Sequence, residues 1–437
     1  MTGTLTHYGY LLENTEKELE RLQKYLIVIP KASKAKYPDG KPILCWSVDS
    51  TGSWLIVPRF YASWRELPIK KNKLSSGDKI ANHKFAGNLK ATQERLSQKV
   101  QEKLQESGGC LAVFPTGTGK TRIALSVYSS LGCKTLVLAP RIKILQGWLA
   151  EIKECFGDSL RAEIMKGKLG NLDEVDMALM TYASYSKVEA EPKVLRKFGM
   201  LILDEVHLVN SEEYSKCLSK WVFHYSLGLT ATPERLDGAE KLSYYYVGRE
   251  VIEVEGVMEN HAQPKEVRRI GTEFWMETPL NEKGDVSWSA YQEAIAKDED
   301  RNELIAQAVR DVLKKEPDRN VLILVNGIEH TEVLAGKLGG GYLHSGVSEA
   351  TQEKVMREEK IIVATYSMCS VGVNIPRLDT LVMGTPRKAH SLKQIMGRIL
   401  RKVHERKPLY LDIRDTKVGF LRKQTRERDE YYKSLGL

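Results

Sequence analysis

Residues 114–121 read Phe-Pro-Thr-Gly-Thr-Gly-Lys-Thr, and this stretch decides how the rest of the chain is interpreted. A short apolar run, residues 110–114, leads into it, and an amphipathic pattern predicts a helix beginning at Lys120 and Thr121. Where a strand, a loop and a helix N-terminus follow one another, backbone N–H groups converge on one point and the helix dipole favours negative charge there. The stretch therefore predicts a phosphate-binding loop, in which the Lys120 ammonium reaches between two phosphates.

The residues of this loop have separate expected roles. Gly117 and Gly119 let the backbone approach the phosphates, and the Thr121 hydroxyl is placed to ligate Mg²⁺. The residues expected to contact the nucleotide here are Pro115, Thr116, Gly117, Thr118, Gly119, Lys120 and Thr121. Phe114 stands where the G-x-x-x-x-G-K-[ST] pattern usually has its first glycine. The pattern thus indicates a nucleoside triphosphate site without identifying the kind of protein that uses it.

Length and composition restrict the class of protein. A chain of 437 residues is too long for one typical domain and predicts two or three. Its longest apolar stretches are far below the roughly twenty residues of a membrane helix, and residues 1–7 show no secretory signal. The six cysteines are scattered, without the spacing of a zinc site or a disulfide framework. We therefore expect a cytoplasmic protein with no membrane partner.

The positive charge is unevenly distributed. The formal charge is +9, and residues 387–437 carry 15 Lys and Arg against 6 Asp and Glu, so the remainder is close to neutral. A second basic stretch runs from Arg65 to Lys90. A solvated surface explains either stretch alone about as well as a polyanionic partner does. With a nucleotide site in the same chain, nucleic acid becomes the better interpretation.

Residues 1–84 have a different pattern from the rest. Thr15 and Glu18 resemble a capping box that opens a short helix, and residues 25–30, 43–48 and 54–57 read as strands. A turn is expected at residues 38–40. The segment predicts a small α+β domain, whose aromatic residues more often form the core than a stacking surface for nucleic acid. These aromatic residues are Trp46, Trp54, Phe60, Tyr61 and Trp64.

From residue 85 onwards, strand-like and helix-like segments alternate. The apolar runs show no alternation between inward and outward positions, as expected of strands buried on both faces of a parallel sheet. These runs are residues 111–114, 135–139, 175–180, 200–203 and 226–229, and then 321–325, 341–343, 361–364, 380–383 and 409–411. A connector around residues 237–264 separates the two groups. We therefore predict an α/β chain with two sheets in series.

Two carboxylates follow the apolar run at residues 200–203. Parallel sheets bind ligands beyond the carboxyl ends of their strands, so Asp204 is expected beside the phosphate loop. There Asp204 can hold the Mg²⁺ that bridges the β- and γ-phosphates, and Glu205 can orient and deprotonate the attacking water. An isolated Asp-Glu pair after a strand is usually a helix cap, but the upstream Lys120 favours the catalytic interpretation.

Four stretches together resemble a known family. Residues 114–121, 204–207, 228–233 and 394–401 resemble motifs I, II, III and VI of superfamily 2 helicases, in the family's order. The resemblance covers about residues 89–413. It implies two tandem RecA-like domains, residues 85–250 and 251–437, preceded by the small α+β domain at residues 1–84. It also implies ATP and Mg²⁺ as cofactors.

Further positions are assigned only by this resemblance. Gln93 matches an adenine-reading glutamine, although Lys90 and Thr92 depart from the commoner residues of that motif. The family's nucleic-acid-contacting motifs match Pro140, Arg141, Thr181 and Thr365, and Gly372 falls in the motif that bridges nucleotide and nucleic acid. Arg398 and Arg401, three residues apart on a predicted helix, would act on the γ-phosphate as arginine fingers, with Gln394 in the same motif. His207, Thr230 and Thr232 would relay hydrolysis to domain motion.

Two details narrow the subgroup. Residues 364–372 and 394–402 resemble most the UvsW-type branch-migration helicases of large tailed phages. That resemblance implies a DNA motor acting on forks, Holliday junctions or R-loops in replication, recombination or repair, within a bacterial host cell if phage-encoded. Duplex or branched DNA is the expected partner, with single-stranded DNA also compatible, and we expect a monomer whose protein partners the sequence does not identify. The alternatives are an RNA-stimulated ATPase and a motor subunit that requires a partner nuclease.

Overall fold

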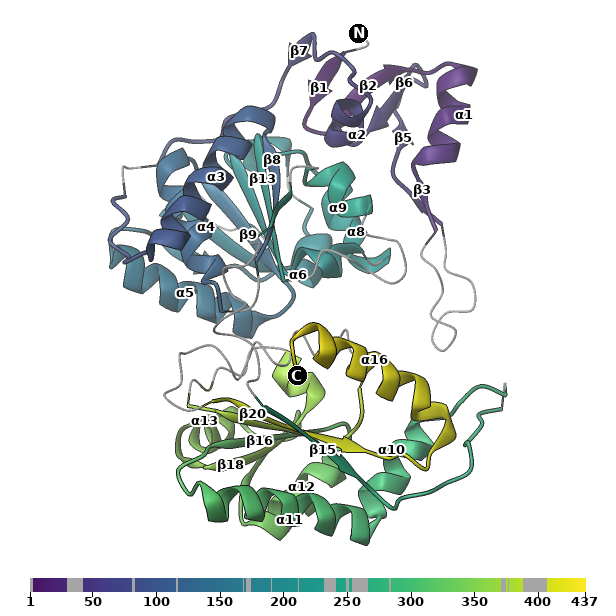
Figure 1. Ribbon diagram of the computed structural model, residues 1–437. Helices are drawn as coiled ribbons and strands as arrows, with labels where there is room; N and C mark the ends of the chain where they lie inside the picture. The colour runs from purple at the N-terminus through teal and green to yellow at the C-terminus, as the bar shows by residue number, and fades with distance from the viewer. Residues whose placement is uncertain are drawn as a thin grey trace. The chain divides into compact units, whose positions relative to one another are not determined.

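A computed structural model describes residues 3–29, 42–80, 83–114, 117–167, 169, 174–189, 191–210, 212–231, 241–248, 251–253, 266–282, 284–370, 375, 377–387 and 407–437. The chain divides into two compact units, Met1–Glu255 and Gly256–Leu437. The first unit contains a small N-terminal module and a large parallel sheet, and the second contains another parallel sheet (Figure 1).

The N-terminal module is built on a five-stranded sheet of order β5-β6-β2-β1-β7. Its strands are β1 (Thr4–Thr6), β2 (Gly9–Glu13), β5 (Ser47–Val48), β6 (Trp54–Val57) and β7 (Lys71–Asn72), and its helices are α1 (Glu16–Tyr25) and α2 (Arg59–Trp64). A separate two-stranded ribbon joins β3 (Ile27–Val28) to β4 (Ile43–Leu44). The module is therefore α+β, as expected.

Several local predictions for this module need correction. Helix α1 begins as predicted, because the Thr15 side chain accepts a hydrogen bond from the Glu18 backbone N–H. The helix continues to Tyr25, so the strand predicted at residues 25–30 shortens to β3. The single strand predicted at residues 43–48 is two strands in different sheets. Strands β1 and β2 were not predicted, and the expected turn at residues 38–40 lies outside the described residues.

The module packs against the large sheet of the same unit. Leu55 and Tyr61 belong to one buried apolar cluster with Leu111 and Leu136 of that sheet. The buried Arg59 guanidinium donates hydrogen bonds to three carbonyl oxygens outside the module, those of Ser107 (3.0 Å), Phe223 (3.2 Å) and His224 (2.7 Å). Of the module's aromatic residues, Phe60 and Tyr61 are core residues, whereas Trp64 is 38% exposed.

The large sheet of the first unit has seven parallel strands in the order β10-β11-β9-β12-β13-β8-β14. The strands are β8 (Gly109–Val113), β9 (Thr135–Ala139), β10 (Ala162–Ile164), β11 (Met177–Thr181), β12 (Met200–Asp204), β13 (Tyr225–Thr230) and β14 (Val251–Glu253). The helices are α3 (Ala91–Ser107), α4 (Lys120–Leu131), α5 (Ile142–Phe156), α6 (Tyr182–Ser186), α7 (Pro192–Leu195), α8 (Glu212–Ser219) and α9 (Lys241–Tyr246), with a 3-10 turn, η2, at Val206–Asn210. The predicted connector thus contains α9 and the edge strand β14.

Both faces of this sheet are buried, which explains the unbroken apolar runs. Along β9, Leu136 and Leu138 belong to the cluster that includes residues of α6, α8 and α9. Val137 and Ala139 belong to the cluster formed with α3, α4 and α5. Figure 1 shows these two groups of helices on opposite faces of the sheet. Successive side chains of a strand point to opposite faces, so every position is selected to be apolar.

The second unit repeats this arrangement with six parallel strands, ordered β15-β20-β19-β16-β18-β17. The strands are β15 (Glu266–Gly271), β16 (Val321–Val325), β17 (Gly341–Leu343), β18 (Ile361–Thr365), β19 (Thr380–Met383) and β20 (Leu409–Arg414). The helices are α10 (Trp288–Lys297), α11 (Glu299–Lys315), α12 (Ile328–Leu338), α13 (Glu349–Glu358), α14 (Tyr366–Ser370) and α16 (Arg422–Ser434), with the 3-10 turn η3 at Gly419–Leu421. Strand β15 was not predicted.

Part of the C-terminal positive charge is used inside this unit. Arg428 is fully buried, and its Nε lies 3.2 Å from an Asp412 carboxylate oxygen. Arg414 contacts Asp412 at 2.8 Å and Asp429 at 2.7 Å. The charge asymmetry of residues 387–437 therefore overstates the positive surface available to a polyanion.

Candidate nucleotide and nucleic-acid site

The predicted site residues of the first unit gather at one edge of its sheet. Strands β8, β12 and β13 end at Val113, Asp204 and Thr230. The register pairs Thr230 with Val113 and Asp204 with Leu229, so the three strand ends lie side by side. Because all strands are parallel, this edge is the carboxyl edge, where open α/β sheets bind ligands.

The phosphate loop has the backbone geometry that its glycines allow. Gly117 has φ 85° and Gly119 has φ 82°, a left-handed conformation that other residues rarely adopt. Gly119 is the N-cap of α4, which begins at Lys120 as predicted. The Lys120 ammonium lies 3.4 Å from the carbonyl oxygen of Phe114, the first residue of the loop. Of the predicted loop residues, Pro115 and Thr116 lie outside the described part of the chain.

Gln93 contacts the phosphate loop directly. Its Nε2 donates a 2.8 Å hydrogen bond to the Thr118 carbonyl oxygen, and its Oε1 accepts one of 2.8 Å from the Lys90 backbone N–H. A Cβ placed on Gly119 would lie 2.4 Å from Gln93 Nε2. Gln93 therefore ties α3 to the loop, and only glycine at position 119 leaves room for this contact.

Asp204 is a buried carboxylate at the end of β12. Its Oδ2 accepts a 2.9 Å hydrogen bond from the indole N–H of Trp148, and its Oδ1 accepts one of 2.9 Å from the Glu205 backbone N–H. Burial raises the pKa of Asp204 and the neighbouring Glu205 raises it further, while Trp148 and Lys120 act in the opposite direction. A buried carboxylate destabilised in this way favours the approach of a cation.

Glu205 and His207 lie on the turn that follows. Glu205 has φ 54°, a conformation that costs energy in a residue with a side chain and is enriched at functional sites. His207 Nδ1 lies 3.1 Å from Thr230 Oγ1 and 3.4 Å from Glu205 Oε2. The histidine thus joins the residue expected to activate water to the end of β13, and Thr232, its expected partner in the relay, lies outside the described residues.

The residues expected to contact nucleic acid in this unit also lie together. Pro140 follows the end of β9, and Arg141 is the exposed N-cap of α5. Thr181 pairs in register with Ala139 at the end of the neighbouring strand, and caps α6 by accepting a hydrogen bond from Ser184 N–H. Thr365 ends β18 in the second unit, where it is buried and its hydroxyl lies 3.1 Å from that of Ser367.

Four further predicted site residues belong to the sequence of the second unit. Gly372, Gln394, Arg398 and Arg401 lie outside the described residues. Their roles rest on the sequence alone.

Two site residues were missed by sequence reasoning. Trp148 donates to the Asp204 carboxylate, and the Tyr182 hydroxyl donates a 2.7 Å hydrogen bond to the Asp204 carbonyl oxygen. Both side chains are almost fully buried, so their apolar rings are indistinguishable from core residues in the sequence. The only available signal is position, because Tyr182 follows Thr181 directly and Trp148 lies two helical turns after Arg141.

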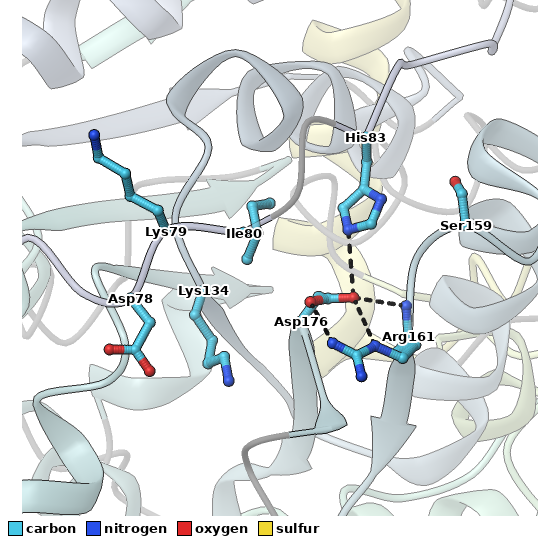
Figure 2. Close-up of a pocket in the computed structure, with 8 residues that line it drawn as sticks. All are labelled: Asp78, Lys79, Ile80, His83, Lys134, Ser159, Arg161 and Asp176. Carbon is cyan, nitrogen blue, oxygen red and sulfur yellow. Dashed lines mark hydrogen bonds and ion pairs between the residues drawn. The ribbon is translucent and has the colours of Figure 1, made fainter.

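A polar pocket of about 450 Å³ lies at the opposite edge of this sheet. Figure 2 shows His83 and Arg161 converging on Asp176, with His83 Nε2 and Arg161 Nη2 each 3.3 Å from a carboxylate oxygen. Lys134, Arg161 and Asp176 each directly precede a strand, so the pocket lies at the amino edge, away from the phosphate loop. The contact between His83 and Asp176 attaches the segment around His83 to the sheet.

The donor set at the carboxyl edge fits Mg²⁺. Thr121 and Asp204 supply hard oxygen atoms, and Mg²⁺ typically takes one or two protein oxygens and completes its shell with phosphates and water. Within the described residues there is no cluster of three or more His, Cys, Asp or Glu that would hold a metal ion without a nucleotide. The arrangement therefore suits a metal that arrives with the nucleotide.

Two ranges of this chain match known protein families. Residues 86–235 match the family described as "Type III restriction enzyme, res subunit", and residues 304–403 match "Helicase conserved C-terminal domain". The chain is 25% identical to a protein of Acanthamoeba polyphaga mimivirus named "Putative ATP-dependent RNA helicase L396", with 98% of this chain and 84% of the relative aligned. It is 26% identical to "Putative helicase 161L" of Invertebrate iridescent virus 6, over 81% of this chain and 82% of the relative.

The fold is also similar to that of a solved structure. A variant of Saccharomyces cerevisiae Dbp5 bound to RNA and ADP BeF3 aligns with 77% of this chain and 87% of its own, at a TM-score of 0.51 and 15% identity. The predicted fold, two tandem RecA-like domains after an α+β region, is confirmed. No helix in the described ranges is long and apolar enough to cross a membrane.

Proposed function

Because the family matches at residues 86–235 and 304–403 are those of a superfamily 2 helicase, we propose that this chain couples ATP hydrolysis to movement along nucleic acid. One observation carries the proposal. The phosphate loop, the Asp204–Glu205 pair and the exposed Arg141 lie on the same carboxyl edge of one sheet. A nucleotide at the loop and a strand at Arg141 would thus contact the same rigid element.

The chain's own residues divide the chemistry between them. Lys120 and the N–H groups at the start of α4 would bind the phosphates, and Thr121 and Asp204 would hold the Mg²⁺. The bound metal supplies positive charge that stabilises the leaving phosphate. Glu205 would accept the proton of the attacking water, and His207, whose Nδ1 lies 3.4 Å from Glu205 Oε2, would orient that side chain. Arg398 and Arg401 would contribute the second unit's positive charge to the γ-phosphate.

For the substrate we propose branched DNA. This choice rests on the resemblance of residues 364–372 and 394–402 to branch-migration helicases, which implies unwinding or branch migration of forks, Holliday junctions or R-loops. Arg141, Thr181 and Thr365 would contact the sugar-phosphate backbone rather than the bases, which suits a motor that moves along any sequence. The exposed basic residues of the N-terminal module would engage the duplex.

RNA is the second candidate substrate. A relative that aligns with 98% of this chain is named as an RNA helicase, and the Dbp5 structure contains RNA. Contacts to the phosphate backbone do not separate the two substrates. A motor subunit that depends on a partner nuclease is a third candidate, because one matching family is named for a restriction enzyme subunit.

The test is a steady-state ATPase measurement with Mg²⁺. Rates are compared without nucleic acid and with single-stranded, duplex, forked and four-way DNA, and with RNA. Stimulation by forked or four-way DNA supports the proposed substrate. Stimulation by RNA alone replaces DNA with RNA, and absence of turnover under every condition points to a required partner.

A further inference from the structure

The side chain and the backbone of Asp204 are held from opposite faces of the sheet. Trp148, on α5, donates from its indole Nε1 to the carboxylate at 2.9 Å. Tyr182, on α6, donates from its hydroxyl to the carbonyl oxygen at 2.7 Å. Helix α5 belongs to the cluster on one face, and Tyr182 belongs to the cluster on the other. Both donors are buried, with 1% and 0% of their surface exposed.

Both donors are carried by elements that begin at the expected nucleic-acid surface. Arg141 caps the N-terminus of α5, and Trp148 follows seven residues later on the same helix. Thr181 caps α6, and Tyr182 is the first residue of that helix. Trp148 lies about 10 Å along the axis of α5 from its cap, and Tyr182 directly follows the cap of α6. A displacement of either cap would therefore be carried to a side chain that contacts Asp204.

We infer that Trp148 and Tyr182 are positioning residues that orient Asp204 toward Mg²⁺ and link the Arg141 and Thr181 loops to the nucleotide. This inference rests on the proposed function. It adds a route within the first unit from nucleic acid to the metal ligand, separate from the arginines of the second unit.

The physical reason lies in the carboxylate's two oxygens. Oδ1 is fixed by the Glu205 N–H and Oδ2 by Trp148, so the plane of the carboxylate has one orientation. Each oxygen keeps a lone pair for the metal or its water. Removing the indole N–H frees the carboxylate to rotate and leaves Oδ2 buried without its donor. Loss of such an outer-shell partner typically weakens metal affinity by about 10- to 100-fold.

The chain offers matched controls. Trp221 is a buried tryptophan whose indole N–H has no hydrogen-bond partner among the described residues, and Tyr185 is a buried tyrosine of α6 whose hydroxyl has none either. The test variants are Trp148→Phe and Tyr182→Phe, and the controls are Trp221→Phe and Tyr185→Phe. Each pair removes the same polar group while keeping an aromatic ring.

The experiment measures binding rather than turnover. A fluorescent, non-hydrolysable ATP analogue is titrated at increasing Mg²⁺, and again with EDTA. In Trp148→Phe, the Mg²⁺ concentration for half-maximal binding should rise on the order of tenfold, while binding in EDTA stays unchanged. Tyr182→Phe loses a donor to the backbone rather than to the carboxylate, so the Mg²⁺ concentration for half-maximal binding should rise less in this variant. An unchanged Mg²⁺ titration in both variants overturns the positioning role.

The link to nucleic acid is measured in the same proteins. The affinity for a labelled forked DNA, and for an RNA of matched sequence, is determined with and without the Mg²⁺-bound analogue. The ratio of the two affinities is the coupling between the sites. This ratio should fall several-fold toward one, the value for uncoupled sites, in both test variants. It should stay at the wild-type value in both controls. An unchanged ratio overturns the link. If the wild-type protein itself binds no nucleotide, the proposed function fails instead.

Discussion

The Arg301 Nε lies 2.8 Å from Oδ1 of Asp415, and neither side chain is exposed to solvent. Arg301 also donates to the Gly384 carbonyl oxygen at 2.7 Å, while Thr272 donates to Asp415 at 2.7 Å and Tyr291 donates to its other oxygen. Burial alone would raise the pKa of Asp415, but the Arg301 charge and these hydrogen bonds lower it below its ordinary value. Through these contacts Arg301, on α11, is joined to the residues that directly follow β19 and β20.

Arg301→Met should destabilise the second unit by about 3–5 kcal/mol, because it leaves Asp415 buried without its cation. The measurement is hydrogen exchange of β16 and β20 peptides in increasing urea, which reports on this unit separately from the first. Arg310→Met is the control, since Arg310 lies on the same helix and its ion pair with Glu303 is about half exposed. That variant should lose less than about 1 kcal/mol. Equal losses in the two variants would contradict the importance of burial.

His330 should make the second unit sensitive to acid. Its Nε2 contacts Asn302 Oδ1 at 2.8 Å, and burial, with a further effect from Arg301, lowers its pKa to about 3. The folded unit therefore binds this proton far less readily than the unfolded chain, whose histidine titrates near 6.5. The contribution of neutral His330 to the stability of the unit is fully present above pH 6.5 and is lost as the pH falls toward 3. The expected loss from pH 7.5 to 5.5 is about 1.4 kcal/mol.

His330→Gln isolates this contribution, because the amide can donate to Asn302 but does not titrate in this range. Urea unfolding is monitored by hydrogen exchange of β16 peptides at a series of pH values. This gives one curve of stability against pH for the wild type and one for the variant. The difference between wild type and variant should change by about 1.4 kcal/mol between pH 7.5 and 5.5. Parallel curves would show that His330 is not the group responsible.

The two large sheets could be predicted because their strands are buried on both faces. Leu136 to Ala139 alternate between two helix layers, so each position is apolar and the run is visible without knowledge of the partners. The edge strands β10 and β14 have three residues each, and β15 carries two arginines, so these lack the same signal. In the N-terminal module, two-residue strands such as β3 and β7 depend on pairing that is distant in sequence, with β4 and β1 respectively.

The candidate site was predictable to the extent that its chemistry is local. The loop around Lys120 and the Asp204–Glu205 pair each consist of contiguous residues, and their types together favour binding of a nucleoside triphosphate with Mg²⁺. Trp148 was not predicted, because its hydrogen bond joins residues 56 positions apart and its ring is a normal core residue. The contact of Gln93 with Thr118 was missed for a similar reason, since it forms only once α3 lies beside the loop.

Arg59 should fix the N-terminal module onto the rest of the first unit. Burial lowers its pKa to about 10, so the guanidinium stays charged at neutral pH while it donates to three carbonyl oxygens. Arg59→Met removes these charge-assisted hydrogen bonds and should lower the local stability of β1 and β2 by about 3 kcal/mol. Hydrogen exchange of peptides from β1 and β2 measures this change.

Arg65→Met is the matched control, because Arg65 directly follows the helix that begins at Arg59. Arg65 pairs with Glu18 at 2.9 Å within the module and makes no hydrogen bond to the large sheet in the described contacts. Its loss should cost less than about 1 kcal/mol and leave β1 and β2 protected. Faster exchange in the control than in Arg59→Met would show that the carbonyl contacts do not hold the module.

Nucleotide turnover and nucleic-acid binding should be separable by mutation. Lys120 lies in the phosphate loop after β8, whereas Arg141 lies after β9, and the two strands β12 and β13 lie between β9 and β8 in the sheet. Lys120→Ala should lower ATP turnover by on the order of 100-fold or more, because the lost ammonium stabilises charge on the transferred phosphoryl group. Without nucleotide, its affinity for forked DNA or RNA should stay within about threefold of wild type, since phosphate-backbone contacts are made elsewhere.

Arg141→Ala is the reciprocal variant. Without nucleotide, it should lower nucleic-acid affinity and reduce the slope of log affinity against log salt by about one, because one phosphate contact is lost. Its affinity for the ATP analogue in the absence of nucleic acid should equal that of wild type. Loss of both turnover and nucleic-acid binding in Lys120→Ala would contradict this division, because the phosphate loop would then also contribute to nucleic-acid binding. An unchanged salt slope in Arg141→Ala would contradict it as well, because Arg141 would then make no phosphate contact.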